Sequence, residues 1–143
     1  MNEIQLATFY IGDVLLGIDI DLVKEICRPM DMTCVPHTPP CVRGVINLRG
    51  EVVTLLDLRR ILGLPEQFNM DVQRNLIVNF SGEHVGFCVD AISDILTLDG
   101  KKVEHAPANI NGMEGRFFRG VYPLPEEIVL VLNLDEILDA TMV

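Results

Sequence analysis

The sequence contains no tryptophan, and only two tyrosines and two serines occur in its 143 residues. Long apolar runs are also missing. The longest purely aliphatic run covers residues 128–132, whereas crossing a bilayer takes about 20 residues. The first residues lack the basic segment and apolar core of a signal peptide. We therefore expect a cytoplasmic protein with no direct membrane insertion.

Positive charge is scarce as well. The chain has 11 lysines and arginines against 21 acidic residues, which gives a net charge of −10. A surface of this sign repels phosphate backbones and anionic lipids, so nucleic-acid binding is disfavoured. The composition suits a protein partner that contributes basic groups.

Residue patterns typical of enzymes are absent. Neither Ser81 nor Ser93 has the strand–turn–helix setting of a nucleophile elbow, and the sequence has no Walker A motif, dinucleotide fingerprint or kinase glycine-rich loop. Asp57 and Asp90 resemble paired carboxylates for acid–base work. Each directly precedes a predicted short helix, however, where an aspartate ordinarily caps the helix. We expect no enzyme and no cofactor.

The cysteines leave one alternative open. Cys34, His37 and Cys41, with Cys27 seven residues before Cys34, offer zinc-type ligands in one loop. The spacing differs from a paired Cys-x-x-Cys knuckle, and nearby prolines restrict wrapping. The alternative hypothesis is a small zinc- or thiol-dependent protein that uses Cys34, His37 and Cys41. We interpret Cys88, in the middle of a predicted strand, as a small buried hydrophobe.

A hairpin at residues 44–59 is the segment around which the other elements are arranged. Two runs rich in valine, isoleucine and leucine flank Arg49 and Gly50, and glycine can take the positive φ of a hairpin corner. Asn47 and Arg49 are polar exceptions among strand formers, which marks them as candidates for a special role.

Apolar periodicity and turn residues predict the remaining elements. Aspartates are expected to cap three of the helices, at Asp21, Asp57 and Asp90, and the first of these places Leu22, Val23 and Ile26 inward. The proline-rich segment 29–41 is expected to be an extended connection. The predicted strands are 4–11, 15–20, 75–80, 85–89 and 128–132, the predicted linker is 64–73, and the predicted last helix is 135–138.

The two halves of the sequence repeat each other. Residues 17–26 match residues 86–95 at an offset of 69, and residues 43–62 match residues 119–138 at an offset of 76 with ten of twenty positions identical. A duplication explains both matches in the same order. We predict one domain over residues 1–143 with subdomains at about 13–63 and 74–140, in which a terminal strand or helix crosses over. The alternative is that small β folds reuse similar strand–helix segments.

The repeat also provides an internal comparison, because positions that serve only the fold should agree between halves. Asn47, Arg49 and Gly50 align with Pro123, Pro125 and Glu126. We therefore predict that Arg49 is a contact residue for a partner. The alternative is that Arg49 pairs with a nearby acidic residue to hold the corner.

Several segments in order resemble CheW-type chemotaxis coupling proteins. They are residues 9–13, 17–20, 23–26, 42–50, 56–59 and 85–90, and the Asn-Leu-Arg-Gly sequence at 47–50 is specific to that family. The resemblance implies a mainly β fold of two tandem SH3-like five-stranded β-barrel subdomains with short helices. It also implies a non-enzymatic signalling adaptor in chemotaxis signal transduction.

The resemblance further implies two partners, which are the regulatory domain of a CheA-type histidine kinase and the cytoplasmic hairpin tip of a methyl-accepting chemoreceptor. Arg49 corresponds to an arginine that the family needs for signalling. An adaptor for surface motility, development or a second messenger fits the same pattern. The expected partner-binding residues are Arg49, Asn47, Gly50, Val23, Glu25, Ile26, Gly44, Gly86, Ile92 and Ile95. For each apolar member, the alternative is ordinary core packing.

Overall fold

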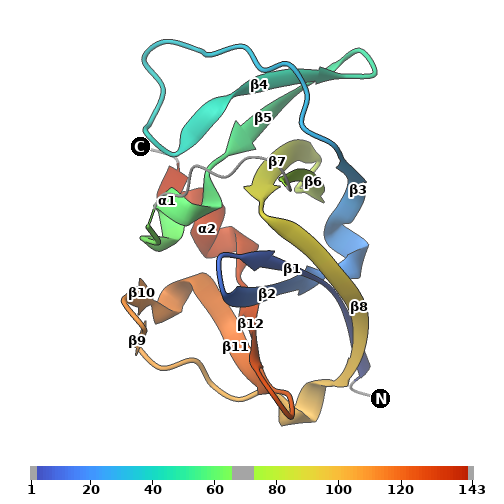
Figure 1. Ribbon diagram of the computed structural model, residues 1–143, viewed down its shortest axis with the longest axis vertical. Coiled ribbons are helices and arrows are strands. Elements are labelled where there is room, and N and C mark those ends of the chain that lie inside the picture. Colours follow the sequence, from blue (N-terminus) through green and yellow to red (C-terminus); the bar gives the residue numbers. More distant parts are fainter. Residues whose placement is uncertain (1–2, 66–72, 142–143) are drawn as a thin grey trace.

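The computed structural model describes residues 3–65 and 73–141, and their main elements are strands (Figure 1). In chain order the elements are β1 (Glu3–Ile11), β2 (Val14–Asp19), η1 (Ile20–Leu22), β3 (Val23–Cys27), β4 (Val42–Leu48), β5 (Glu51–Leu56), α1 (Leu58–Leu62), β6 (Arg74–Phe80), β7 (Glu83–Val89), β8 (Ala91–Asp99), η2 (Gly100–Lys102), β9 (Asn109–Ile110), β10 (Met113–Glu114), η3 (Gly115–Phe117), β11 (Phe118–Pro123), β12 (Ile128–Leu132) and α2 (Leu134–Thr141).

Two five-stranded sheets dominate the described residues. The β1 sheet has the order β11-β12-β2-β1-β8, and the β6 sheet has the order β3-β6-β7-β5-β4. In Figure 1 the β6 sheet lies above the β1 sheet, and α1 and α2 lie beside the junction. Among the described helices, none is long and apolar enough to cross a membrane. The predicted fold class, mainly β with two five-stranded units and short helices, is confirmed.

Each sheet combines strands from both halves of the chain. The β6 sheet takes β3, β4 and β5 from the first half and β6 and β7 from the second, whereas the β1 sheet takes β1 and β2 from the first half and β8, β11 and β12 from the second. The predicted segments 13–63 and 74–140 therefore both contribute to both sheets. As a division into subdomains they stay a prediction.

The sequence repeat is reproduced in the strand registers. Val45 pairs with Thr54, and 76 positions later Val121 pairs with Leu130. Irregularities in the pairing of β4 with β5 and of β11 with β12 also fall at matching positions, between Val42 and Gly44 and between residues 118 and 120. The parallel pairs β5–β7 and β12–β2 keep the same relation. The two halves are thus copies in three dimensions.

The core has three parts. A central cluster joins the two sheets through side chains such as Phe9, Leu16, Phe87 and Leu132, together with Ile137 of α2. A second cluster lies inside the β1 sheet around Leu6 and Val129, and a third inside the β6 sheet around Ile46 and Ile77. Burial on both faces explains why the strands read as nearly continuous aliphatic runs.

Two predicted helices are wrong, because the residues after Asp21 and Asp90 form strands β3 and β8. Both segments contain β-branched residues, which lose side-chain freedom in a helix and pack well in a sheet. Each strand also pairs along one side with a distant strand, β3 with β6 and β8 with β1. Pairing with a distant strand therefore outweighs the local capping signal.

Other local predictions are confirmed. The side chain of Asp57 accepts a hydrogen bond from the backbone N–H of Arg60 at the start of α1, which ends at Gly63 in the left-handed conformation. Strand β12 has the predicted bounds. The segment 29–41 lacks regular elements apart from a bridge between Thr33 and Val45. Most of the predicted linker 64–73 lies outside the described residues.

Asp90 has a different role from the predicted cap. Its Oδ2 accepts a hydrogen bond of 2.6 Å from the backbone N–H of Gly12 and forms an ion pair with the largely buried guanidinium of Arg59. Gly12 lies in the turn between β1 and β2, while Arg59 belongs to α1. The Asp90 carboxylate therefore ties the β1 sheet to the β6 sheet at their junction.

Replacing Asp90 by asparagine should lower the free energy of unfolding by about 2 kcal/mol, because a largely buried guanidinium loses its counter-charge. Urea denaturation measures the change. Asp21→Asn is the matched control, since Asp21 is the exposed residue at the equivalent position and its loss should change stability by less than about 0.5 kcal/mol. Equal losses in the two variants would contradict the assigned role of Asp90.

Candidate functional site

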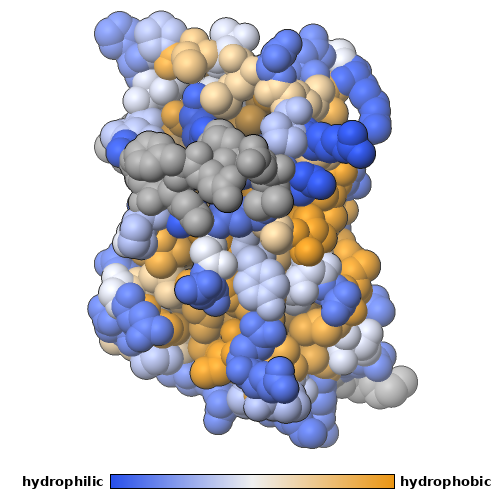
Figure 2. Space-filling model, in the orientation of Figure 1, coloured by the Kyte–Doolittle hydropathy of each residue, from blue (hydrophilic) through white to orange (hydrophobic). Residues whose placement is uncertain are grey.

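Strands β3 and β8 lie at the ends of their sheets and carry five of the ten predicted site residues. Val23 and Ile26 of β3 are the repeat equivalents of Ile92 and Ile95 of β8. Ile26 is 43% exposed, Ile92 37% and Ile95 63%, while Val23 is half-buried. Figure 2 shows hydrophobic side chains gathered on the flank where Figure 1 places β3 and β8. We call these four side chains the β3/β8 face.

This arrangement follows from the position of both strands. A strand at the end of a sheet pairs on one side only, so its other side and its outward side chains stay accessible. Isolated exposed aliphatic residues are ordinary on protein surfaces, but equivalent aliphatic residues exposed on two equivalent edge strands mark a candidate contact surface. The face contains no group that could transfer a proton or act as a nucleophile.

Gly44 and Gly86 lie in the interior and not on this surface. A Cβ atom added at Gly86 would lie 2.5 Å from a Leu55 side-chain carbon, and one at Gly44 would lie 2.6 Å from the backbone oxygen of Thr33. Their repeat equivalents, Gly120 and Gly17, are also tightly packed. Close packing within the chain therefore explains both glycines, and a direct contact with a partner stays a prediction.

The predicted hairpin corner is a turn at Arg49 and Gly50. Both residues have positive φ, 54° and 85°, which is the requirement of the two-residue turn whose twist matches that of the strands. The Oδ1 of Asn47 accepts a hydrogen bond of 2.9 Å from the backbone N–H of Gly50. Asn47 and Gly50 thus shape the turn that presents Arg49.

Arg49 is brought next to another predicted site residue. Its Nη1 lies 2.7 Å from Oε2 of Glu25 on β3, across the β6 sheet from the hairpin. The alternative of pairing with a nearby acid is therefore met in the structure. The side chain of Arg49 is nevertheless 77% exposed, against 19% for Glu25. Because a guanidinium has five N–H donors, most of its binding capacity is still available.

A second polar cluster beside this ion pair was missed by the sequence analysis. Glu51 Oε2 lies 3.3 Å from Nζ of Lys24, and its Oε1 lies 2.5 Å from Nδ1 of His84. Some desolvation acts to raise the pKa of Glu51, but hydrogen bonds from Lys24 and His84 lower it below its usual value. The sequence signal was weak, because the three residues come from β3, β5 and β7 and share no motif.

The cysteine hypothesis gains no support. Within residues 3–65 and 73–141, no three His, Cys, Asp or Glu side chains are grouped so as to hold a metal ion. All four cysteines are free, and Cys34 is exposed. Cys27 and Cys88 pack on the cluster inside the β6 sheet, where burial raises the pKa of both thiols. Buried thiols of this kind are poor nucleophiles.

The fold and the site together define a class of protein, a small two-sheet β scaffold whose candidate site is an exposed contact surface. The family model described as CheW-like domain matches residues 5–142. The chain belongs to the CheW-like domain family. This is a family of scaffolding proteins, so the prediction of a non-enzymatic protein is confirmed.

Individual relatives agree with this membership. The chain is 31% identical to a probable chemotaxis protein CheW of Rhizobium etli over 96% of this chain and 88% of the relative. It is 32% identical to the chemotaxis protein CheW of Rhizobium meliloti over 93% and 86%. The crystal structure of scaffolding protein TtCheW from Thermoanaerobacter tengcongensis is similar with a TM-score of 0.84 and 26% identity, covering 92% of this chain and 84% of that one.

The lowered pKa of Glu51 leads to a prediction about pH. Lys24→Met should raise the pKa of Glu51, because the carboxylate loses the ammonium group that donates a hydrogen bond to it. A depressed folded-state pKa contributes stability above the unfolded-state pKa, and this contribution is lost as the pH falls through the folded-state value. Carbon-detected NMR titration of the Glu51 carboxyl measures the shift. An unchanged titration curve in Lys24→Met would contradict the assigned interaction.

Proposed function

We propose that this protein is a cytoplasmic adaptor that couples the cytoplasmic hairpin tips of methyl-accepting chemoreceptors to the regulatory domain of a CheA-type histidine kinase. Membership of the CheW-like domain family supports this proposal, as do the relatives named as chemotaxis proteins. The observation that carries it is the β3/β8 face, which exposes aliphatic side chains on two equivalent edge strands.

The β3/β8 face suits the receptor. A chemoreceptor tip is a helical hairpin, and an amphipathic helix binds through aliphatic anchors spaced along one side. Ile26, Ile92 and Ile95 supply complementary aliphatic surface from two strands. Burying one such side chain on binding contributes about 1.5–3 kcal/mol before the costs of association.

Arg49 suits the coupling to the kinase. It stands at the tip of the β4–β5 hairpin, mostly exposed, and Glu25 anchors one of its nitrogens. Simultaneous occupancy of two surfaces raises the effective concentration of kinase at the receptor. Because Glu25 lies on β3, between Val23 and Ile26 of the β3/β8 face, a change at the receptor surface reaches Arg49 through one ion pair.

Ile95→Asp tests the receptor surface. A charge at this 63% exposed position should leave folding intact, because little apolar burial is lost, but should weaken binding to a receptor hairpin fragment by at least about tenfold. Isothermal titration calorimetry with the fragment measures the affinity.

The matched control is Ile128→Asp, which introduces the same charge at a 54% exposed isoleucine on β12, outside the β3/β8 face. This variant should keep wild-type affinity for the receptor fragment. Equal loss of affinity in both variants would indicate a nonspecific charge effect and would argue against the β3/β8 face.

Exchanging the charges of Arg49 and Glu25 tests the second surface. Arg49→Glu should fold and still impair receptor control of kinase activity, because the exposed guanidinium is lost. The double variant Arg49→Glu/Glu25→Arg rebuilds the internal ion pair with the opposite charge outward. Control of kinase activity in reconstituted receptor–kinase complexes should stay impaired in the double variant.

The double variant distinguishes a direct contact of Arg49 with a partner from a role in supporting the local structure. Restoration of coupling in the double variant would show that Arg49 acts only by pairing with Glu25. Thermal denaturation accompanies the assay, because loss of stability in parallel with loss of coupling would assign Arg49 to the fold alone.

A further inference from the structure

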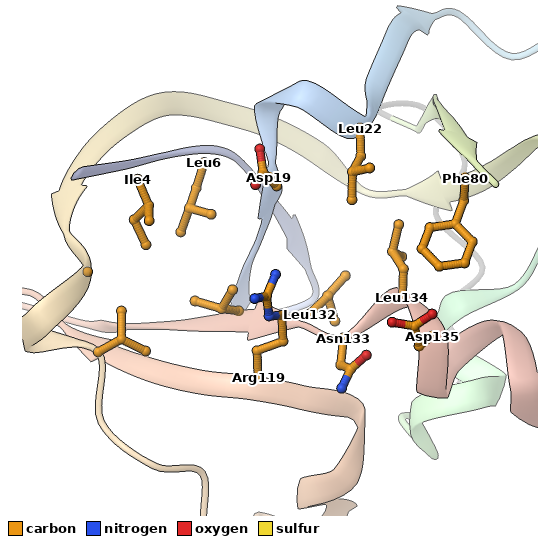
Figure 3. A pocket seen from close by; sticks show the side chains of 13 residues that line it. Ile4, Leu6, Asp19, Leu22, Phe80, Arg119, Leu132, Asn133, Leu134 and Asp135 are labelled. Carbon is orange, nitrogen blue, oxygen red and sulfur yellow. The ribbon is translucent and has the colours of Figure 1, made fainter. Parts of the chain in front are cut away.

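A cleft of about 510 Å³ opens where β1, β11 and β12 meet η1, η2 and the start of α2 (Figure 3). Its wall is mixed, with apolar side chains that include Ile4, Leu6, Leu22, Phe80 and Leu132 beside polar and charged ones. The size is within the range of protein ligand sites. The cleft shares no residue with the β3/β8 face.

The charges around this cleft are unbalanced. Asp19 and Asp135 line it together with Arg119, whose side chain extends from β11 in Figure 3. Asp21 follows Asp19 in η1 and is exposed. Within the described part of the chain, none of these four side chains forms a salt bridge within 4 Å.

The other copy of the repeat has an ion pair at the equivalent positions. Arg59 is the equivalent of Asp135, and it forms an ion pair with Asp90, the equivalent of Asp21. The guanidinium of Arg59 thus occupies the junction between the sheets in that copy. In the copy with the cleft, an aspartate replaces this arginine.

The remaining repeat-equivalent positions show the same difference in charge between the two copies. Arg43 and Asp57 are the equivalents of Arg119 and Asn133, and Cys88 is the equivalent of Asp19. In the copy that holds the Arg59–Asp90 ion pair, the formal charges at these five positions cancel, because Arg43 and Arg59 balance Asp57 and Asp90. In the copy with the cleft, Arg119 is the single cation at these five positions, against Asp19, Asp21 and Asp135, and of these Asp19 and Asp135 line the cleft with Arg119. This copy therefore has one arginine fewer than the other.

We propose that a protein partner inserts an arginine, flanked by an aliphatic side chain, into this cleft. Its guanidinium binds Asp19 and Asp135, which line the cleft, in the place that Arg59 takes in the other copy, and the aliphatic neighbour packs on Leu6 and Leu22. Arginine fits better than lysine because its planar fork binds two carboxylates at once. The net charge of −10 favours approach of a basic segment.

An NMR titration of the isotope-labelled full chain tests this inference with a peptide, acetyl-Leu-Arg-Leu-amide. The peptide should shift backbone amides of residues 19–22 and 134–136, and the glutamine analogue acetyl-Leu-Gln-Leu-amide should bind at least about fivefold more weakly. Neither receptor nor kinase is present, so the result is independent of the proposed adaptor function. Absent shifts, or equal affinity for both peptides, would overturn the inference.

A variant that fills the cleft from within provides the second test. Asp135→Arg restores the residue type of the copy that holds the Arg59–Asp90 ion pair, so it should raise the midpoint of thermal unfolding by several degrees and abolish peptide binding. The control Asp139→Arg makes the same charge change at an exposed position of α2 that does not line the cleft. If Asp135→Arg fails to fold, Asp135→Asn should still weaken peptide binding. Equal effects of the substitutions at positions 135 and 139 would overturn the inference.

Discussion

Neither half of this chain can complete a sheet without the other. Strand β3 pairs with β6, and β8 pairs with β1, so each half supplies the edge strand next to the first strand of the other half. The central core is likewise shared, with Phe9 and Phe87 packed in one cluster. Because apolar burial drives folding, the two sheets are expected to form together. The two copies pair at equivalent positions, with Ile26 opposite Leu76 on β6 and Ile95 opposite Ala7 on β1.

The pairing of each edge strand with the other half also determines where the candidate surface lies. Because β3 and β8 are equivalent strands at the ends of different sheets, Ile26 and Ile95 are exposed on separate sheets. The hairpin that carries Arg49 reaches back to β3 through Glu25. Strand β3 therefore carries part of the candidate contact surface and also Glu25, the ion-pair partner of Arg49.

Local signals predicted the local features well. Gly50 predicted the turn at Arg49 and Gly50, the aliphatic run 128–132 predicted β12, and the internal repeat predicted that two units share one architecture. The helices expected after Asp21 and Asp90 were wrong, because pairing with β6 and β1 depends on residues far away in sequence. The same reason explains why the Lys24–Glu51–His84 cluster and the ion pair of Asp90 with Arg59 were missed. Residues that meet only in the folded chain carry no common spacing.

The left-handed backbone at Arg49 affects which residue types suit this position. A left-handed conformation costs a residue with a Cβ atom about 1 kcal/mol relative to glycine, and asparagine tolerates it better than most. Selection for stability alone would favour either replacement at this exposed corner. Under the proposed contact role, replacing Arg49 by either residue should therefore change stability and activity in opposite directions.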